Sequence, residues 1–155
     1  MRRILDILLG RTRPIRSKLE RLFAISTAYL TLTANLRLTA SGRAGVCFRP
    51  LESSEFQSLS QELERILKIS GRETDTTIDA VEDEFGFQWV ILQDSQFEDL
   101  VATIHLVSLT LEDKGFGEQL LAAVFKFLDR EKPIFWIYNY KRGNFYPFVP
   151  RGGRG

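Results

Sequence analysis

The chain has 155 residues, of which 44% are apolar and 26% are charged, and its formal net charge is +1. These values are typical of one soluble globular domain and exclude a disordered chain. No apolar run approaches the roughly 20 residues that a bilayer-spanning helix needs. The sequence contains one histidine, His105, and one cysteine, Cys47, so most catalytic and metal sites built on imidazole or thiolate are excluded. We therefore expect a protein that is not an enzyme and carries no cofactor.

The near-neutral total hides a separation of charge along the chain. Residues 1–22 carry seven basic and two acidic side chains, whereas residues 50–113 carry fifteen acidic and three basic ones. Such asymmetry favours a partner of complementary charge or a membrane surface. The alternative is intramolecular, with basic ends that fold over an acidic middle or with solvated helix faces.

The first elements are predicted to be helical. Residues 2–9 form a short amphipathic pattern that ends at Gly10, and apolar residues recur at helical spacing over 15–25, after Pro14. We divide the chain into a basic amphipathic segment at 1–13, a single domain at 14–150 and a disordered Gly/Arg tail at 151–155. The apolar stretch near the start is too brief for a secretory signal, so we expect a cytoplasmic protein.

The next two elements are predicted to be strands. Leucine and alanine alternate with polar residues from Leu30 to Leu38, which is typical of a half-buried strand. A turn at Ser41-Gly42 leads into a partner strand over 44–49. Cys47 lies on the opposite side of this strand from Val46 and Phe48.

Two further units repeat the order of one helix and two strands. A helix is predicted over 54–70, followed by a strand from Ile78, a bend at 82–84 and a strand over 85–91. A third helix over 96–113 ends before Gly115. Residues 119–128 fit a helix or a strand, and we predict a strand because loops separate them from the third helix and from the strand at 133–140. That last strand is apolar on both faces, as in the centre of a sheet.

These elements predict an α+β fold. We expect a single domain with a mainly antiparallel sheet of about six strands, helices on one face and a hairpin for each strand pair. The residues expected to be largely buried are Leu30, Leu32, Leu36, Val46, Phe48, Phe87, Trp89 and Trp136.

Two segments are candidates for binding. One is irregular and rich in aromatic and basic residues: Tyr140, Lys141, Arg142, Gly143, Asn144, Phe145, Tyr146, Pro147 and Phe148. This composition is typical of an interaction hot spot, and its alternative is a C-terminal clasp over the core. The other candidate would dock on a membrane or a partner, or else pack on the sheet: Arg2, Arg3, Ile4, Leu5, Ile7, Leu8, Leu9, Arg11 and Arg13.

Other candidate sites are better explained by structure alone. His105 has no second histidine or cysteine near it in sequence, and Glu82-Asp83-Glu84 lacks the ligand spacing of a calcium loop. Gly115-x-Gly117 has two glycines where a dinucleotide-binding loop needs three. We interpret these as a half-buried histidine, a solvated turn and a helix terminator.

Several stretches carry a resemblance to a known family. They are residues 5–14, 42–49, 111–121 and 140–148, the last with Lys-Arg-Gly followed by Phe-Tyr-Pro-Phe. The chain resembles the PspA-associated protein PspAB family from Leu5 to Pro150. The resemblance implies a small cytoplasmic protein linked with phage shock protein A, a coiled-coil protein of the envelope stress response. It supplies no catalytic residue.

The leading hypothesis is therefore a non-enzymatic adaptor. It would bind a phage shock protein A homologue through its sheet surface or its C-terminal aromatics, with possible peripheral contact with an anionic membrane. The alternatives are a nucleic-acid-binding module, which the acidic middle opposes, and a small-molecule-binding enzyme of unknown type. We expect no nucleic-acid partner.

Overall fold

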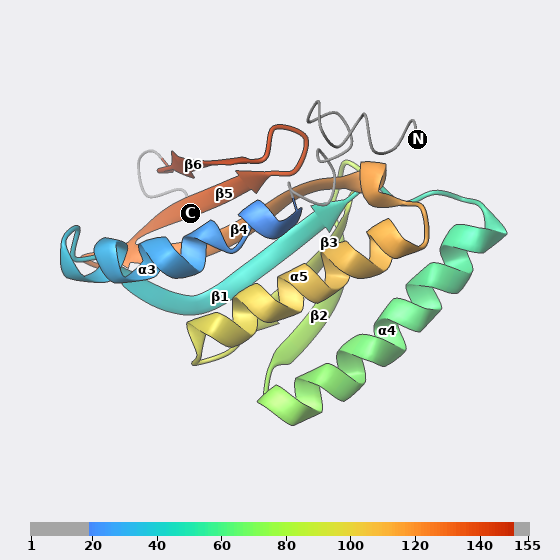
Figure 1. Cartoon of the computed structure of the whole chain (residues 1–155), viewed down its shortest axis with the longest axis horizontal. Coiled ribbons are helices and arrows are strands. Elements are labelled where there is room, and N and C mark those ends of the chain that lie inside the picture. The colour runs from blue at the N-terminus through green and yellow to red at the C-terminus, as the bar shows by residue number, and fades with distance from the viewer. Residues whose placement is uncertain (1–18, 151–155) are drawn as a thin grey trace, which may run out of the picture.

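The computed structural model describes residues 19–150 as a six-stranded sheet with three α-helices in front of one face (Figure 1). The strand order is β2-β3-β1-β4-β5-β6, and every neighbouring pair is antiparallel. The strands are β1 Thr39–Phe48, β2 Thr77–Glu82, β3 Gln88–Gln93, β4 Leu120–Asp129, β5 Lys132–Asn139 and β6 Asn144–Phe148. The helices are α3 Ala24–Ala34, α4 Ser54–Thr74, α5 Phe97–Asp113 and the short 3-10 helix η1 Gly117–Gln119. The predicted α+β class is confirmed.

The sheet separates two faces because side chains alternate along each strand. On the helix-covered face, Val46 packs beside Val90 and Ala123, and all three side chains are buried. Phe125, Phe127 and Tyr138 extend this core under α3 and α5. None of the helices within residues 19–150 is long and apolar enough to span a membrane.

The predicted strand over Leu30–Leu38 is wrong. Residues up to Ala34 belong to α3, a bend and extended residues follow, and β1 begins at Thr39. Ile25, Tyr29 and Leu32 recur at helical spacing, and Tyr29 stacks on Phe97 with 4.5 Å between ring centroids. Leu30 is 72% exposed while Leu32 is 5% exposed, so the two lie on opposite sides of a helix. The apolar residues of this segment fit both the two-residue period of a strand and the 3.6-residue period of a helix. Packing on α5 selects the helix.

The helix predicted over 15–25 is also wrong at its end. In the described part of the chain, residues 19–21 are helical, a turn occupies 22–23 and α3 then continues to Ala34. The predicted turn at Ser41-Gly42 is a bulge inside β1, where the register with β4 shifts between Ala40 and Arg43. Gly42 has φ +79°, a conformation that glycine adopts without strain.

β1 therefore has no hairpin partner next to it in sequence. It pairs with β3 and β4, and the hairpins are β2–β3, β4–β5 and β5–β6. The predicted hairpin of 30–38 with 44–49 and the threefold helix-hairpin pattern are wrong in this first unit. The expected number of six strands survives because one predicted strand is a helix and β6 is an additional strand.

The remaining predictions differ in detail. The strand at 119–128 is confirmed as β4, and Gly115 follows the end of α5 with φ +86°. Phe85 lies in the β2–β3 turn, and β3 begins at Gln88 rather than at 85. Burial was predicted correctly for Leu32, Val46 and Phe48. It was wrong for Leu30 and Leu36, which are exposed, and for Phe87, Trp89 and Trp136, which are half-buried.

Candidate interaction surface

The aromatic segment Tyr140–Phe148 is divided between the two faces of the sheet. Tyr140 is buried, and its hydroxyl shares a short hydrogen bond with Ser108 of α5. The ring of Phe145 lies 4.8 Å from that of Tyr138 and 6.4 Å from that of Phe125. This half of the segment closes the core at the end of the sheet, as a clasp does. The segment is not irregular as predicted, since residues 144–148 form β6.

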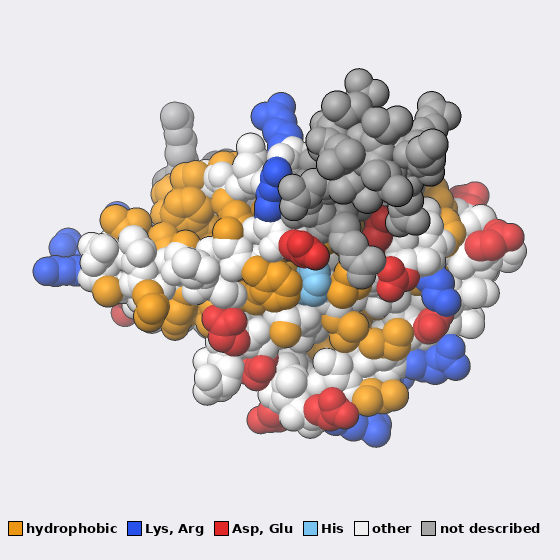
Figure 2. Space-filling view, in the orientation of Figure 1, with side chains coloured by type: hydrophobic (Ala, Val, Ile, Leu, Met, Phe, Trp, Pro, Cys, Tyr) orange, Lys and Arg blue, Asp and Glu red, His pale blue; other side chains and the backbone are white. Residues whose placement is uncertain are grey.

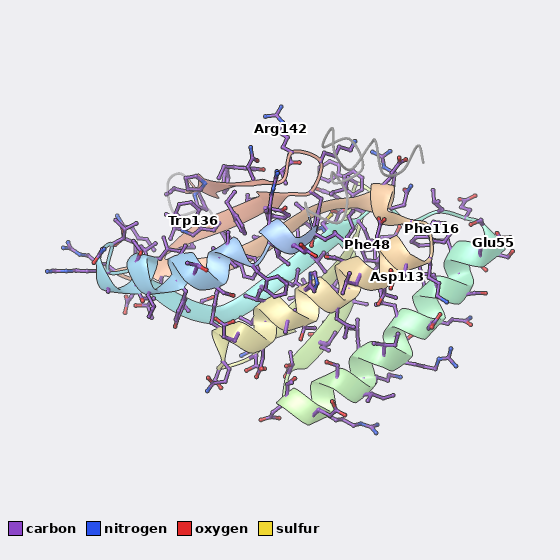
Figure 3. All side chains as sticks on the ribbon, viewed as in Figure 1. Phe48, Glu55, Asp113, Phe116, Trp136 and Arg142 are labelled. Carbon is purple, nitrogen blue, oxygen red and sulfur yellow. The ribbon has the colours of Figure 1, made fainter. Side chains whose placement is uncertain are left out.

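The other half of the segment lies on the surface. Tyr146 and Phe148 are exposed, and the register places Phe148 beside Phe135 on the face that the helices do not cover. The turn before β6 is fixed by Asn139, whose side-chain oxygen accepts a hydrogen bond from the backbone N–H of Arg142 at 3.1 Å. Figure 3 shows Arg142 projecting away from this turn. A binding role for Tyr140–Phe148 stays a prediction, and Tyr146 and Phe148 are the aromatics of the segment that a partner could reach from this face.

The basic candidate segment near the start lies outside the described residues. This holds for Arg2, Arg3, Ile4, Leu5, Ile7, Leu8, Leu9, Arg11 and Arg13. Its docking on a membrane or partner stays a prediction.

The face of the sheet opposite α3, α4 and α5 is apolar across its centre. We call it the open face, and within residues 19–150 no helix covers it. The strand registers place these apolar side chains on it, each half-buried or exposed: Val81, Trp89, Ile91, Val124, Phe135, Ile137, Tyr146 and Phe148. A contiguous exposed apolar surface of this kind usually marks a binding site.

Trp89 forms a fixed platform on the open face. Its indole N–H donates a hydrogen bond to the Asp83 carboxylate at 2.9 Å. A Cβ atom at Gly45 would lie 3.4 Å from the indole ring, at van der Waals distance, so the ring packs close to the backbone of β1. Beside this platform lies a shallow hollow of about 240 Å³, lined in part by Val124 and Phe135. Such a rigid aromatic ring is well suited to contact a partner at low entropic cost.

Two cations lie in the middle of the open face. Arg43 of β1 and Lys126 of β4 are register partners, and both line the hollow beside Trp89.

Cys47 also lies on β1, and burial and the nearby negative charge of Asp83 raise its pKa to about 11. The thiol is therefore protonated near neutral pH, which argues against a nucleophilic role.

Asp83 explains the acidic bend at 82–84. Although partial desolvation acts against it, the pKa of Asp83 is lowered because its carboxylate accepts hydrogen bonds from the Trp89 indole and from the backbone of Phe87, Phe85 and Gly86. The carboxylate thus fixes the turn and the Trp89 platform together. Within residues 19–150 no group of three or more His, Cys, Asp or Glu side chains could hold a metal ion.

On the helix-covered side, the described residues present a mixed surface (Figure 2). Figure 2 shows acidic, basic and apolar side chains mixed over it. His105 lies there, and its ring packs against Phe23 with 4.5 Å between centroids. This aromatic contact agrees with the structural interpretation of the histidine.

The sequence pattern predicts a buried Trp89, whereas the structure places it half-buried on the open face, a surface that the pattern does not identify. The available signal was the strand at 133–140, which is apolar at successive positions. In a sheet with helices on one face only, such a strand must present half of its apolar side chains to the other face. The pattern alone predicts a central strand covered on both sides, and the one-sided helix layer of residues 19–150 leaves one of its faces open.

The structure defines a two-layer α+β protein with an apolar, partly basic open sheet face. The family model described as PspAB, PspA associated protein B, matches residues 2–155. The chain therefore belongs to the PspAB family, whose description links it with PspA. No curated protein and no solved structure matches the chain.

Proposed function

We propose that this protein is a non-enzymatic adaptor of the envelope stress response that binds a PspA homologue through the open face. The single observation that carries the proposal is the apolar centre of that face, between Val81 on β2 and Phe148 on β6. A folded soluble domain gains stability when such side chains leave water, so a partner that covers them is favoured. The family description supplies the identity of the partner.

The charges of the open face indicate what the partner presents. Arg43 and Lys126 lie within the apolar area, so a complementary surface places carboxylates beside its own apolar side chains. An amphipathic helix with an apolar stripe and acidic flanks meets this requirement. The resemblance to the PspAB family implies a coiled-coil PspA partner, and we infer that one of its helices supplies this surface. We place the complex in the cytoplasm at the inner face of the membrane.

Binding to the purified PspA homologue tests the proposal. The double variant Tyr146→Asp/Phe148→Asp introduces charges at two exposed positions and should weaken binding at least about tenfold, which corresponds to about 1.4 kcal/mol. Arg43→Glu/Lys126→Glu should also weaken binding, most strongly at low salt where charges are least screened. Both double variants should leave the far-ultraviolet circular dichroism spectrum unchanged.

Leu30→Asp is the matched control, because Leu30 is exposed and lies on α3, across the sheet from the open face. This variant should bind the PspA homologue as the parent chain does. Equal loss of binding in Leu30→Asp, or parental binding in both open-face variants with an unchanged fold, contradicts the proposal.

A further inference from the structure

Helix α4 and the edge strand β2 diverge from a point of close contact. At Gly71 a Cβ atom would lie 2.9 Å from the Thr76 carbonyl oxygen and 3.2 Å from Ile78, so only glycine lets the two elements meet there. From this point the helix and the strand separate in the shape of a V (Figure 1). A groove of about 610 Å³ lies between them.

The groove has an apolar floor and a polar outer wall. Leu63 and Leu67 of α4 face Ile78 of β2 and Val90 of β3 across its floor. The outer wall is a stripe of α4 at helical spacing, formed by Ser60, Glu64, Lys68 and Arg72. The groove can therefore hold an apolar side chain of a bound segment, while the backbone of that segment runs along the edge of β2.

Strand β2 is the first strand of the sheet and has a regular edge. All six of its residues pair with β3 without a register shift, from Thr77 opposite Gln93 to Glu82 opposite Gln88. No strand in the described residues pairs with its other side. Alternate N–H and C=O groups of such an edge point outward and can pair with one more strand.

The charge along this edge is of one sign. The sequence has no lysine or arginine from Glu73 to Asp113, and Asp75, Asp79 and Glu82 are exposed along β2 and the turn before it. No ion pair joins these three carboxylates to a lysine or arginine of the described chain. A strand with basic side chains is therefore complementary, whereas a second copy of β2 would place like charges opposite one another.

We infer that the groove between α4 and β2 binds an extended, basic segment of a partner as a seventh strand of the sheet. The side chains opposite Ile78 and Ala80 are apolar and enter the groove, and the intervening side chain opposite Asp79 is lysine or arginine. The groove lies on the helix-covered side of the sheet, whereas Asp79 and Val81 of the same strand face the open side. The alternative is that the acidic side chains of β2 serve only to prevent edge-to-edge aggregation. In that case a basic strand does not bind to β2.

Titration of the ¹⁵N-labelled full chain with two synthetic octapeptides tests the inference. One peptide alternates valine and lysine, and the other alternates valine and glutamate. The lysine peptide should shift the amide resonances of Thr77–Glu82, slow their hydrogen exchange and bind at least about tenfold more tightly than the glutamate peptide. The variant Asp79→Lys should reverse this preference, because residue 79 lies opposite a charged side chain of either peptide.

Glu55→Lys is the matched control, because Glu55 is an exposed carboxylate near the start of α4, at the end remote from Gly71 (Figure 3). It should leave the preference for the lysine peptide unchanged. Equal binding of both peptides, or resonance shifts confined to the open face, overturns the inference. A concentration-dependent dimer that protects the β2 amides without peptide would overturn it in favour of a second copy.

Discussion

The division of the aromatic segment between core and surface predicts different consequences for two phenylalanines that are three residues apart. Phe145 is half-buried against Tyr138 and Phe125, whereas Phe148 is 52% exposed and meets Phe135 at 6.4 Å. Replacing each by alanine removes the same atoms from the same strand. The two variants therefore compare a clasp residue with a surface residue in a matched pair.

The magnitudes follow from burial. A fully buried phenylalanine costs about 3–5 kcal/mol when it is truncated to alanine, so half-buried Phe145 should cost about 2 kcal/mol. For a chain of this length that is a fall in melting temperature of about 4–8 °C. Phe148→Ala should cost less than about 1 kcal/mol and lower the melting temperature by less than about 4 °C.

Thermal unfolding followed by circular dichroism, together with urea denaturation, measures both changes. Binding to the PspA homologue should respond in the opposite order, with a larger loss for Phe148→Ala than for Phe145→Ala at a temperature where both are folded. If Phe148→Ala destabilises the fold as much as Phe145→Ala does, β6 packs as one unit and the division is wrong.

Two further predictions concern buried polar groups. Tyr140→Phe should cost about 1 kcal/mol of unfolding free energy, and a double-mutant cycle with Ser108→Ala should give a coupling of similar size, because each single variant removes the same hydrogen bond; independent effects in urea denaturation would contradict this pairing. The Cys47 thiol should react with a thiol reagent at pH 8 at least roughly 100-fold more slowly than a free cysteine, because its pKa of about 11 leaves little thiolate. Since that pKa is higher in the folded state than in the unfolded state, the contribution of Cys47 to the free energy of unfolding is complete below about pH 8.5 and is lost as the pH rises to about 11. Cys47→Ala should flatten this part of the plot of stability against pH. A Cys47 thiol that reacts at the rate of a free cysteine in the folded chain would refute the raised pKa.

Local sequence determined those elements whose pattern fits one period. Helix α4 carries Phe56, Leu59, Leu63 and Leu67 at helical spacing and begins after Ser53, whose hydroxyl accepts a hydrogen bond from the Phe56 N–H at 3.2 Å. The helix continues through Gly71 to Thr74, so its predicted end at residue 70 is too early. The α+β class, the antiparallel sheet and the candidate aromatic segment follow from such patterns, because each depends on contacts within a few residues or on overall composition.

Tertiary structure decided the rest. The pattern of apolar residues from Leu30 to Leu38 fits a strand as well as a helix. The stacking of Tyr29 on Phe97 of α5 selects the helix. In the same way, β1 loses its expected hairpin partner because β3 and β4, distant in sequence, occupy both of its edges. Trp89 faces away from the core because the three α-helices of residues 19–150 lie on the other face of the sheet. Periodicity tells which residues share a face, but which face is covered depends on contacts between elements far apart in the chain.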